Sequence, residues 1–252
     1  MTTYLSRGAG LPHLHLRGHR GRADLHIHTC HSDGRPTVQA VLDHVAKRTR
    51  LQVIAVTDHD TIEGGLRAQE LQHRYRFQVV LGEEVTTTQG HILALYIGER
   101  VQPMMSPEDT IQAIHEQGGL AIAAHPFITS FGEEIQGIGR RFAELPFDAV
   151  EVENSTPFMY VANYRAKHHN RHVGGLPVVG SSDAHIVEAI GKSYTRFPGS
   201  SAADLRRAIE RSMTSAHASN YGSRDLLAYL GFWLASLRPR PTRSMRTRTE
   251  QR

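Results

Sequence analysis

The sequence predicts an α/β fold in which helices cover a largely parallel sheet, arranged as a (β/α) barrel or as a doubly wound sheet. Short β-branched and apolar runs alternate with stretches of helical periodicity, which favours this class. Several runs are almost continuously apolar, as expected for strands covered on both faces. We expect strands at residues 23–28, 53–58, 79–86, 91–97, 120–125, 149–154 and 177–182.

The predicted helices follow recognisable start signals and span residues 37–48, 111–117, 158–168 and 205–211. Ser106 and Pro107 provide a cap and a first-turn proline ahead of the second of these helices. Gly118 and Gly119 then end it. No internal repeat, heptad pattern or glycine-rich phosphate loop interrupts the alternation.

The composition predicts a soluble, cytoplasmic protein. The single cysteine, Cys30, excludes an intramolecular disulfide and fits a reducing compartment. No apolar run follows the first basic residues, so we expect no signal peptide. The longest apolar stretch, 226–237, is shorter than the about 20 residues that cross a bilayer.

Basic residues are concentrated at the two ends of the chain. We expect a flexible basic arm at 1–21, a barrel domain at 22–215, a C-terminal helix at 216–237 and a disordered basic tail at 238–252. The leucine-rich face of the C-terminal helix is expected to pack on the barrel. Basic arms can attract nucleic acid, although arms this short can also serve only solubility.

Residues that bind metal ions well stand at the ends of almost all the predicted strands, in a chain with 17 histidines. His26 and His28 are two residues apart in a strand, so their side chains point to the same face. The C-terminal ends of parallel strands meet at one face of a barrel, where active sites lie. We expect convergence there of His26, His28, Asp33, His59, Glu83 or Glu84, His91, His125, Asp183 and His185.

These motifs resemble those of the PHP superfamily, which is named for polymerase and histidinol-phosphatase members. The resemblance rests on Asp24-Leu25-His26-Ile27-His28-Thr29, Ser32-Asp33-Gly34, Thr57-Asp58-His59-Asp60, Glu84, His91, Ala124-His125-Pro126 and Ser182-Asp183-Ala184-His185, and spans roughly residues 22–215. It is nearest to stand-alone phosphoesterases that act on nucleotides and short oligonucleotides. It implies a distorted (β/α)7 TIM-like barrel with a trinuclear metal centre.

The resemblance also implies a ligand set. One ion would be held by His26, His28, Glu84 and Asp183, a second by Glu84, His91 and His125, and a third by Asp33, His59 and His185. Glu84 is chosen over Glu83 because the family pattern is glycine, any residue, glutamate. Such a mixture of imidazole and carboxylate suits Mn²⁺, Fe²⁺ or Zn²⁺. A metal-bound hydroxide is expected to attack phosphorus, with Glu84, Asp183 and His185 as catalytic residues acting through it.

Two further groups of residues are expected around the ions. Asp24, Asp58 and Asp60 stand next to ligand histidines, where a carboxylate often fixes the tautomer, although capping and solvation are alternative roles. Substrate phosphate is expected to meet some of Arg140, Arg141, Asn154, Arg165 and Lys192, each of which can also be a simple surface residue.

The main functional hypothesis is a metal-dependent phosphoesterase for nucleotides or short oligonucleotides, of the nucleotide phosphatase or 5′–3′ exonuclease type. Its partners would be a small phosphorylated substrate or a short nucleic acid, with no obligate protein partner. Alternatives are a histidinol-phosphatase type, an amidohydrolase-like barrel that cleaves C–N bonds, and an inactive module that binds metal or nucleic acid. The intact ligand set argues against the last, and the group Asp33, His59 and His185 favours a third ion over the amidohydrolase.

Overall fold

The structure is a computed structural model, which describes residues 20–128, 136–219 and 221–236. Their strands form one nine-stranded sheet with the order β7-β6-β5-β4-β3-β2-β1-β8-β9. The strands are β1 (Arg20–Asp24), β2 (Val53–Val56), β3 (Gln78–Thr87), β4 (Gly90–Leu95), β5 (Leu120–Ala123), β6 (Ala149–Asn154), β7 (Val178–Ser181), β8 (Ser193–Pro198) and β9 (Ser215–Ala218).

The sheet curls into a nearly closed, distorted barrel. β1, β2 and β3 run parallel to one another, as do β5, β6 and β7, while β4 is antiparallel to both of its neighbours. The junction between β1 and β7 is a single bridge between Ile27 and Ala184, which lie just beyond the ends of these strands. There the His28 N–H donates to the Ala184 carbonyl at 2.9 Å, and the Ala184 N–H donates to the His26 carbonyl at 3.2 Å. β8 and β9 extend the sheet past this junction as antiparallel strands.

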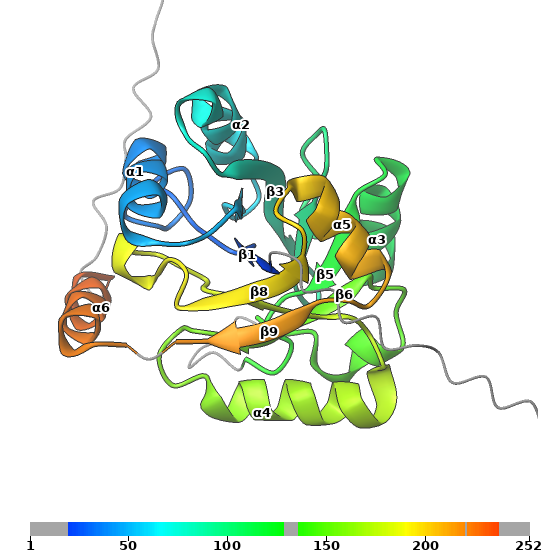
Figure 1. Ribbon diagram of the computed structural model, residues 1–252. Helices are drawn as coiled ribbons and strands as arrows, with labels where there is room; N and C mark the ends of the chain where they lie inside the picture. Colours follow the sequence, from blue (N-terminus) through cyan, green and yellow to red (C-terminus); the bar gives the residue numbers. More distant parts are fainter. Residues whose placement is uncertain (1–19, 129–135, 220, 237–252) are drawn as a thin grey trace, which may run out of the picture.

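Helices surround the strands, with α1 and α2 on one side and α4 on the opposite side (Figure 1). They are α1 (Val38–Arg48), α2 (Glu63–Leu71), α3 (Pro107–Glu116), α4 (Tyr160–His169), α5 (Ala202–Glu210) and α6 (Ser223–Ser236). Short helical turns stand at η1 (Gln72–Arg74), η2 (Gly139–Ala143), η3 (Asn170–Gly174) and η4 (Val187–Ala189). Ser106 caps α3 and Ser201 forms a capping box with Asp204 on α5, so both helices begin where side chains satisfy their first backbone N–H groups.

Helix α5 closes one end of the barrel. Its Leu205, Ala208 and Ile209 belong to the apolar cluster formed by inward side chains of the strands. The Tyr96 hydroxyl donates to the carbonyl of Ala202 at 2.7 Å, at the end where β4 finishes and the parallel strands begin. The other end, where the parallel strands finish, is left for polar side chains.

The expected α/β barrel is confirmed, with differences in its elements. The expected strands 79–86 and 91–97 pair as an antiparallel hairpin, so the barrel is not a simple repeat of parallel units. The strands β8 and β9 and the helix α2 were not predicted. α2 begins with Glu63-Gly64-Gly65, and paired glycines are unfavourable inside a helix, which hides it from propensity. Both glycines are buried, and an added Cβ on Gly65 would lie 2.7 Å from Leu81.

The domain boundaries expected from the sequence stay predictions. The basic tail at 238–252 and nearly all of the arm at 1–21 lie outside the described residues, as do residues 129–135. Helix α6 packs through Ala228, Tyr229 and Phe232 against an apolar cluster of the barrel. Phe232 belongs to the apolar face expected to make this contact, whereas five other members of that face are 49–67% exposed, namely Leu226, Leu227, Leu230, Trp233 and Leu234. Among the described residues, none of the helices has the length and apolar character needed to cross a membrane.

Truncating a barrel side chain tests this packing. Ile122 in β5 is fully buried, so Ile122→Ala should lower the free energy of unfolding by about 2–5 kcal/mol. Leu66→Ala on α2 removes a side chain that is 38% exposed and should change it by less than about 1 kcal/mol. Chemical denaturation of both variants measures the difference, and equal stabilities would contradict the assignment of Ile122 to the core.

Candidate metal centre

The polar end of the barrel gathers the side chains that the sequence placed at strand ends. Two backbone bridges set their positions. The bridge between Ile27 and Ala184 brings the segment with His26 and His28 beside the segment with Asp183 and His185. A second bridge joins His59, after β2, to Glu84 in β3.

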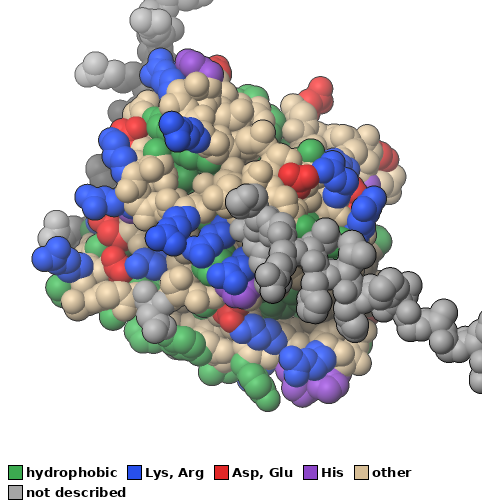
Figure 2. All heavy atoms as spheres, viewed as in Figure 1, with side chains coloured by type: hydrophobic (Ala, Val, Ile, Leu, Met, Phe, Trp, Pro, Cys, Tyr) green, Lys and Arg blue, Asp and Glu red, His purple; other side chains and the backbone are tan. Residues whose placement is uncertain are grey.

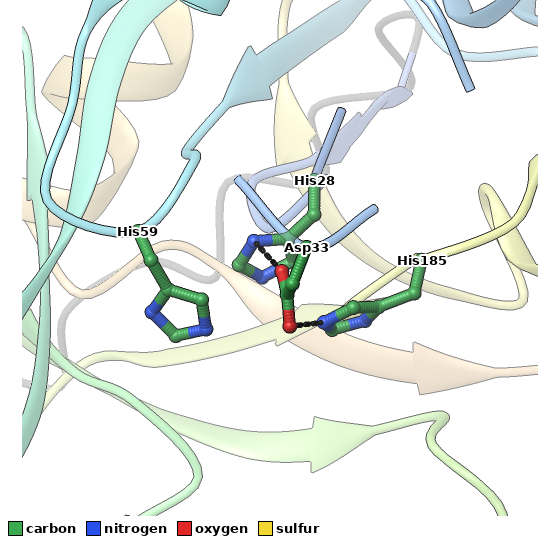
Figure 3. Close-up of side chains that lie close together, drawn as sticks. All are labelled: His28, Asp33, His59 and His185. Carbon is green, nitrogen blue, oxygen red and sulfur yellow. Dashed lines mark hydrogen bonds and ion pairs between the residues drawn. The ribbon is translucent and has the colours of Figure 1, made fainter. Parts of the chain in front are cut away.

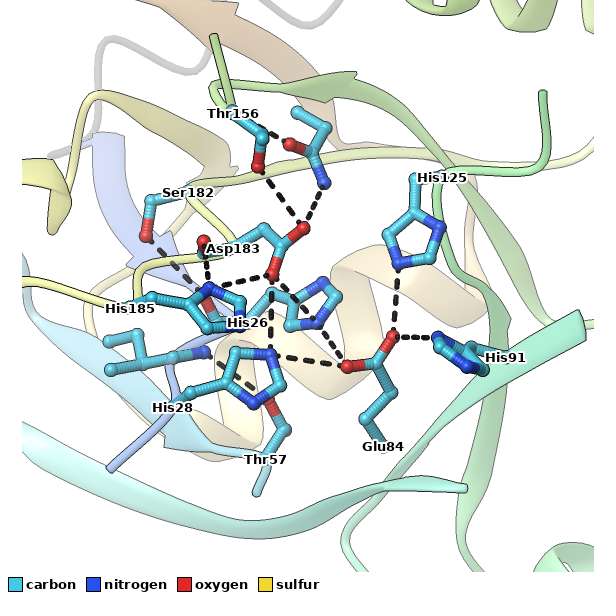
Figure 4. A network of polar contacts seen from close by, with 12 residues as sticks. His26, His28, Thr57, Glu84, His91, His125, Thr156, Ser182, Asp183 and His185 are labelled. Carbon is cyan, nitrogen blue, oxygen red and sulfur yellow. Dashed lines mark hydrogen bonds and ion pairs between the residues drawn. The ribbon is translucent and has the colours of Figure 1, made fainter. Parts of the chain in front are cut away.

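Glu84 is the centre of this arrangement (Figure 4). Its carboxylate is 1% exposed and lies within 3.4 Å of five imidazoles. One oxygen, Oε2, is 2.9 Å from His26, 3.1 Å from His28 and 3.4 Å from His59. The other, Oε1, is 3.0 Å from both His91 and His125. Glu84 therefore faces two groups of histidines at once, the geometry of a bridging carboxylate.

Asp183 is a second buried carboxylate in the centre. Its Oδ1 lies 3.2 Å from His28 Nε2 and 3.5 Å from His26 Nε2. Its Oδ2 accepts hydrogen bonds of 3.2 Å from the Asn154 amide and from the Thr156 hydroxyl. Asp183 has a φ of 53° and His125 a φ of 23°, backbone conformations that are strained for residues other than glycine and that often occur at functional sites.

A third group opens toward solvent and comprises His28, Asp33, His59 and His185 (Figure 3). Asp33 Oδ2 lies 3.0 Å from His185 Nε2, and Asp33 Oδ1 lies 3.6 Å from His28 Nδ1. The side chains of Asp33, His59 and His185 are 40%, 27% and 16% exposed, whereas those of His26 and His28 are fully buried. The centre is thus closed at its base and accessible on the Asp33 side.

The donor atoms form three sets that could each hold a metal ion, with the potential ligand atoms of each within 4.8 Å of one another. They are His26, His28, Glu84 and Asp183; His59, Glu84 and His91; and His28, Asp33, His59 and His185. These overlap the ligand sets implied by the resemblance, with two differences. His28 joins the third set as well as the first, and His59 stands in the second set, where His125 was expected. His125 still contacts Glu84 directly.

Some buried imidazole nitrogens of the centre lack a hydrogen-bond partner among the described residues, as expected for atoms that bind metal ions. Neither ring nitrogen of His28 has a partner in hydrogen-bond geometry, although carboxylate oxygens of Glu84 and Asp183 lie 3.1 and 3.2 Å from its Nε2. His125 Nδ1 is also buried without a partner. Imidazole nitrogens and carboxylate oxygens that converge in a buried site, some of them without a hydrogen-bond partner, are the donor set of a transition-metal site.

The electrostatics of the centre favour ionised carboxylates. Burial alone would raise the pKa of Glu84 and of Asp183, but the surrounding histidines hold both well below their usual range. Burial lowers the pKa of His26, yet the charges of Glu84, Asp183 and Glu151 outweigh burial and raise it well above normal. Burial also lowers the pKa of His28, but the carboxylates of Asp183 and Glu84 outweigh burial and raise it to about 10. Protons and metal ions therefore compete for the same imidazole nitrogens.

Glu83 and Glu84 lie on opposite faces of β3. Glu83 Oε2 accepts a hydrogen bond of 2.8 Å from the Val101 backbone, and burial raises the pKa of Glu83 to about 7. The alternation of a strand puts neighbouring side chains on opposite faces, so one of the two glutamates faces the histidines and the other faces the loop at Val101.

Asp24, Asp58 and Asp60 connect loops, and their side-chain bonds go to backbone N–H groups and hydroxyls. Asp24 accepts from Ser182 and from the Gly191 backbone, at 2.6–2.9 Å. Asp58 accepts from both the backbone and the hydroxyl of Thr29 at 2.7 Å, and from the Ser32 hydroxyl at 2.7 Å. Asp60 accepts from the Thr86 backbone at 2.8 Å. These bonds fix the segments that carry the histidines and Asp33.

The carboxylate that contacts the outer ring nitrogen of His26, an expected ligand, is Glu151 in β6, which the sequence analysis missed. Glu151 Oε1 lies 3.3 Å from His26 Nδ1, and Oε2 accepts from the His125 backbone at 2.9 Å and from the Asn154 amide at 3.0 Å. The available signal was a strand of buried appearance that nevertheless contains Glu151 and Glu153, since buried charges are rare unless they are paired.

The expected phosphate-binding residues are placed in different surroundings. Asn154 is buried and bonded to Glu151 and Asp183, so it supports the carboxylates. Arg141 pairs with Glu108, and Lys192 pairs with Asp225. The remaining two, Arg140 and Arg165, border an open pocket of about 590 Å³ that is also lined by Phe127, Tyr164, His168 and His169.

Comparison with known proteins identifies the family. A family model described as PHP-associated matches residues 162–214. The uncharacterised protein MJ1587 of Methanocaldococcus jannaschii is 39% identical over 145 residues, which are 53% of this chain and 82% of that protein. A phosphoribosyl 1,2-cyclic phosphate 1,2-diphosphodiesterase of Eggerthella lenta is 40% identical over 82 residues, 30% of this chain, and the match spans only 31% of that enzyme.

Among solved structures, the fold is similar to that of a two-domain protein from Bacteroides vulgatus, described as containing a predicted PHP-like metal-dependent phosphoesterase. The TM-score is 0.63 at 19% identity, over 86% of this chain and 70% of the other. This structural similarity covers most of the nearly closed, distorted barrel, beyond the segments that match in sequence. On the motifs, the PHP-associated match at 162–214 and the barrel architecture together, the chain belongs to the PHP superfamily.

Proposed function

We propose that the protein is a metal-dependent phosphoesterase with three divalent ions at the polar end of the barrel. The observation that carries this proposal is Glu84, a buried carboxylate shared by five imidazoles. The ions would be held by His26, His28, Glu84 and Asp183, by Glu84, His91 and His125, and by Asp33, His59 and His185. Bound divalent ions supply a nucleophile from water at neutral pH and neutralise charge on the phosphoryl oxygens.

The chain's own side chains fix where the reaction takes place. Asp33, His59 and His185 are the more exposed members, so the phosphate ester approaches from their side. Glu84 and Asp183 hold the inner ions, and the buried pair His26 and His28 excludes bulk water from the base. Three ions carry more positive charge than Asp33, Glu84 and Asp183 return, which suits an anionic substrate.

Nucleotides or short oligonucleotides are the proposed substrates, supported by the surface beside the centre. The segment 160–174, which contains α4, has no acidic residue and carries Arg165, Lys167 and Arg171. Phe158, Tyr160 and Tyr164 are 94%, 84% and 68% exposed. In Figure 2, hydrophobic side chains crowd one end of α4, and Lys, Arg and His side chains the other. Exposed rings beside basic groups suit stacked bases and their phosphates.

This surface connects to the centre through the chain. Thr156, which bonds Asp183, stands two residues before Phe158, and His125 stands two residues before Phe127 in the pocket wall. The pocket also presents Arg140 and Arg165, the cations that suit a second phosphate.

A cyclic phosphodiester is the second candidate substrate. The similarity to the Eggerthella lenta cyclic phosphate diphosphodiesterase favours it, over the 82 residues that match. The same centre can serve a monoester or a diester, because the ions act on phosphoryl oxygens that both substrates share.

Phosphate release from a panel of esters tests the proposed activity. The manganese-loaded protein should hydrolyse at least one of p-nitrophenyl phosphate, a 3′,5′-bisphosphonucleotide, histidinol phosphate, a cyclic phosphodiester and a short 5′-phosphorylated RNA, and EDTA should abolish turnover. Asp183→Asn, which suits the positive φ, should lose metal and activity together while circular dichroism stays unchanged. Bound metal without turnover on any ester would contradict the proposal, and C–N substrates would test the amidohydrolase alternative.

The third ion has its own test. His59→Ala should reduce the metal content by one ion per chain and lower kcat by about tenfold or more, because a charge on the phosphate loses its partner. His73→Ala removes an exposed histidine of η1 and should change neither quantity. Metal analysis by mass spectrometry with steady-state kinetics measures both, and full activity of His59→Ala would rule out the three-ion assignment.

The pocket arginines should affect large substrates selectively. Arg165→Gln and Arg140→Gln should each raise KM for a 3′,5′-bisphosphonucleotide by about tenfold, the size expected for one charge-assisted hydrogen bond, and leave p-nitrophenyl phosphate unaffected. Arg141→Gln is the matched control, since Arg141 is paired with Glu108. Equal KM values in all three variants would place the second phosphate elsewhere.

A further inference from the structure

Helix α6 lies against the open side of the metal centre. It contacts η4, in the loop from β7 to β8 that also carries Asp183 and His185 (Figure 1). The Phe232 ring centre is 5.7 Å from that of His185. Tyr229 follows at 6.1 Å from Phe232, and Tyr221 at 6.0 Å from Tyr229. A row of aromatic rings from the C-terminal segment therefore begins at a proposed ligand.

Two cations hold α6 in this position. The Arg35 guanidinium donates to the Gly231 carbonyl at 3.1 Å and lies 5.1 Å from the Phe232 ring centre. Arg35 stands two residues after Asp33, and its backbone N–H donates to the His185 carbonyl at 2.9 Å. Lys192 pairs with Asp225 at the start of the helix. α6 is thus attached to the two loops that carry Asp33 and His185.

Among the described residues, the buried hydroxyls of Tyr221 and Tyr229 make no hydrogen bond of good geometry, and their polar neighbours are Ser155 and Thr156. Tyr229 as a whole is 9% exposed. A buried hydroxyl that makes no hydrogen bond destabilises the folded protein by the full cost of removing the hydroxyl from water. Such groups are therefore rare, and a role in ligand binding or catalysis can explain them. Phenylalanine at either position would avoid the penalty and keep the ring packing.

Both hydroxyls lie in the electrostatic field of the centre. Burial raises the pKa of Tyr229, and the charges of Asp183 and Asp33 raise it further. Burial likewise raises the pKa of Tyr221 to about 12, with Asp183 contributing. Both groups therefore remain neutral donors at physiological pH. Thr156, the polar neighbour of the Tyr229 hydroxyl, bonds Asp183 at 3.2 Å.

We propose that Tyr229, together with Tyr221, donates hydrogen bonds to oxygens of the phosphate held at the metal centre, so that α6 forms one wall of the substrate site. The inference rests on the proposed function, whose ions place a phosphate between Asp183 and Asp33. Phosphate oxygens are strong acceptors, and a neutral donor pairs with them at the same time as the ions. The C-terminal helix is then part of the phosphate site as well as of the packing.

The test removes single hydroxyl groups. In the manganese-loaded protein, Tyr229→Phe should lower kcat/KM for p-nitrophenyl phosphate by about tenfold to a hundredfold, in the range of lost donors to a phosphoryl or acyl transition state. It should weaken binding of inorganic phosphate at least about fivefold by calorimetry, with metal content and melting temperature maintained. Tyr221→Phe should show the same pattern with a smaller effect. Tyr75→Phe, whose hydroxyl bonds Asp43 on the outside of the barrel, is the control.

Each outcome decides the proposal. Phosphate affinity and kcat/KM of both variants equal to those of Tyr75→Phe would overturn it while leaving the phosphoesterase activity intact. Loss of metal together with phosphate affinity would also overturn it, because the tyrosines would then support the ligands alone. Phosphate binding that depends on Tyr229 in a protein that hydrolyses no ester would support the tyrosine site and reject the proposed function.

Discussion

The arrangement at the polar end of the barrel depends on the compensation of one buried charge, that of Glu84. An ionised carboxylate away from water is strongly unfavourable unless opposite charges and hydrogen-bond donors surround it. Here imidazoles from four different strand ends meet the two carboxylate oxygens. That requirement explains why β3 and β4 form a hairpin whose paired strands bring Glu84 and His91 together, and why His59 bridges to Glu84 through the backbone. The fold and the centre are therefore specified by the same contacts.

The features that the sequence predicts well are those written in local patterns. Apolar runs of four to six residues gave the strands β2, β5, β6 and β7, because buried parallel strands have a nearly uniform composition. The cap at Ser106 located α3. The convergence of His26, His28, Glu84 and Asp183 followed from the rule that parallel strands end at the same face. These inferences need only spacing and residue type.

The features that escaped prediction depend on contacts between distant positions. Glu151 lies 125 residues from His26 in the sequence, and no local pattern relates them. The strands β8 and β9 include polar residues and lie at an edge of the sheet, so they lack the apolar composition that marked the others. The exposed leucines of α6 show that a correctly located helix can still be assigned the wrong packing face. Helical periodicity located the helix but gave no information on which of its two apolar faces meets the barrel, because Tyr229 and Phe232 take that position through their neighbours in three dimensions.

Backbone pairing between neighbouring strands is not uniform around the barrel, because a single bridge, between Ile27 and Ala184, joins the first and last parallel strands. Elsewhere, neighbouring strands are joined by ladders of two to six residue pairs, whereas the first and last parallel strands meet at one pair flanked by His26, His28, Asp183 and His185. The ions proposed to bind these side chains would cross-link the two strands where the backbone pairing is weakest. Metal binding would then raise the free energy needed to open the barrel at this junction, because the ions bind the closed form and not the open one. Chelation should release this junction before the rest of the sheet, and amide hydrogen exchange at His28 and Ala184 should report that release.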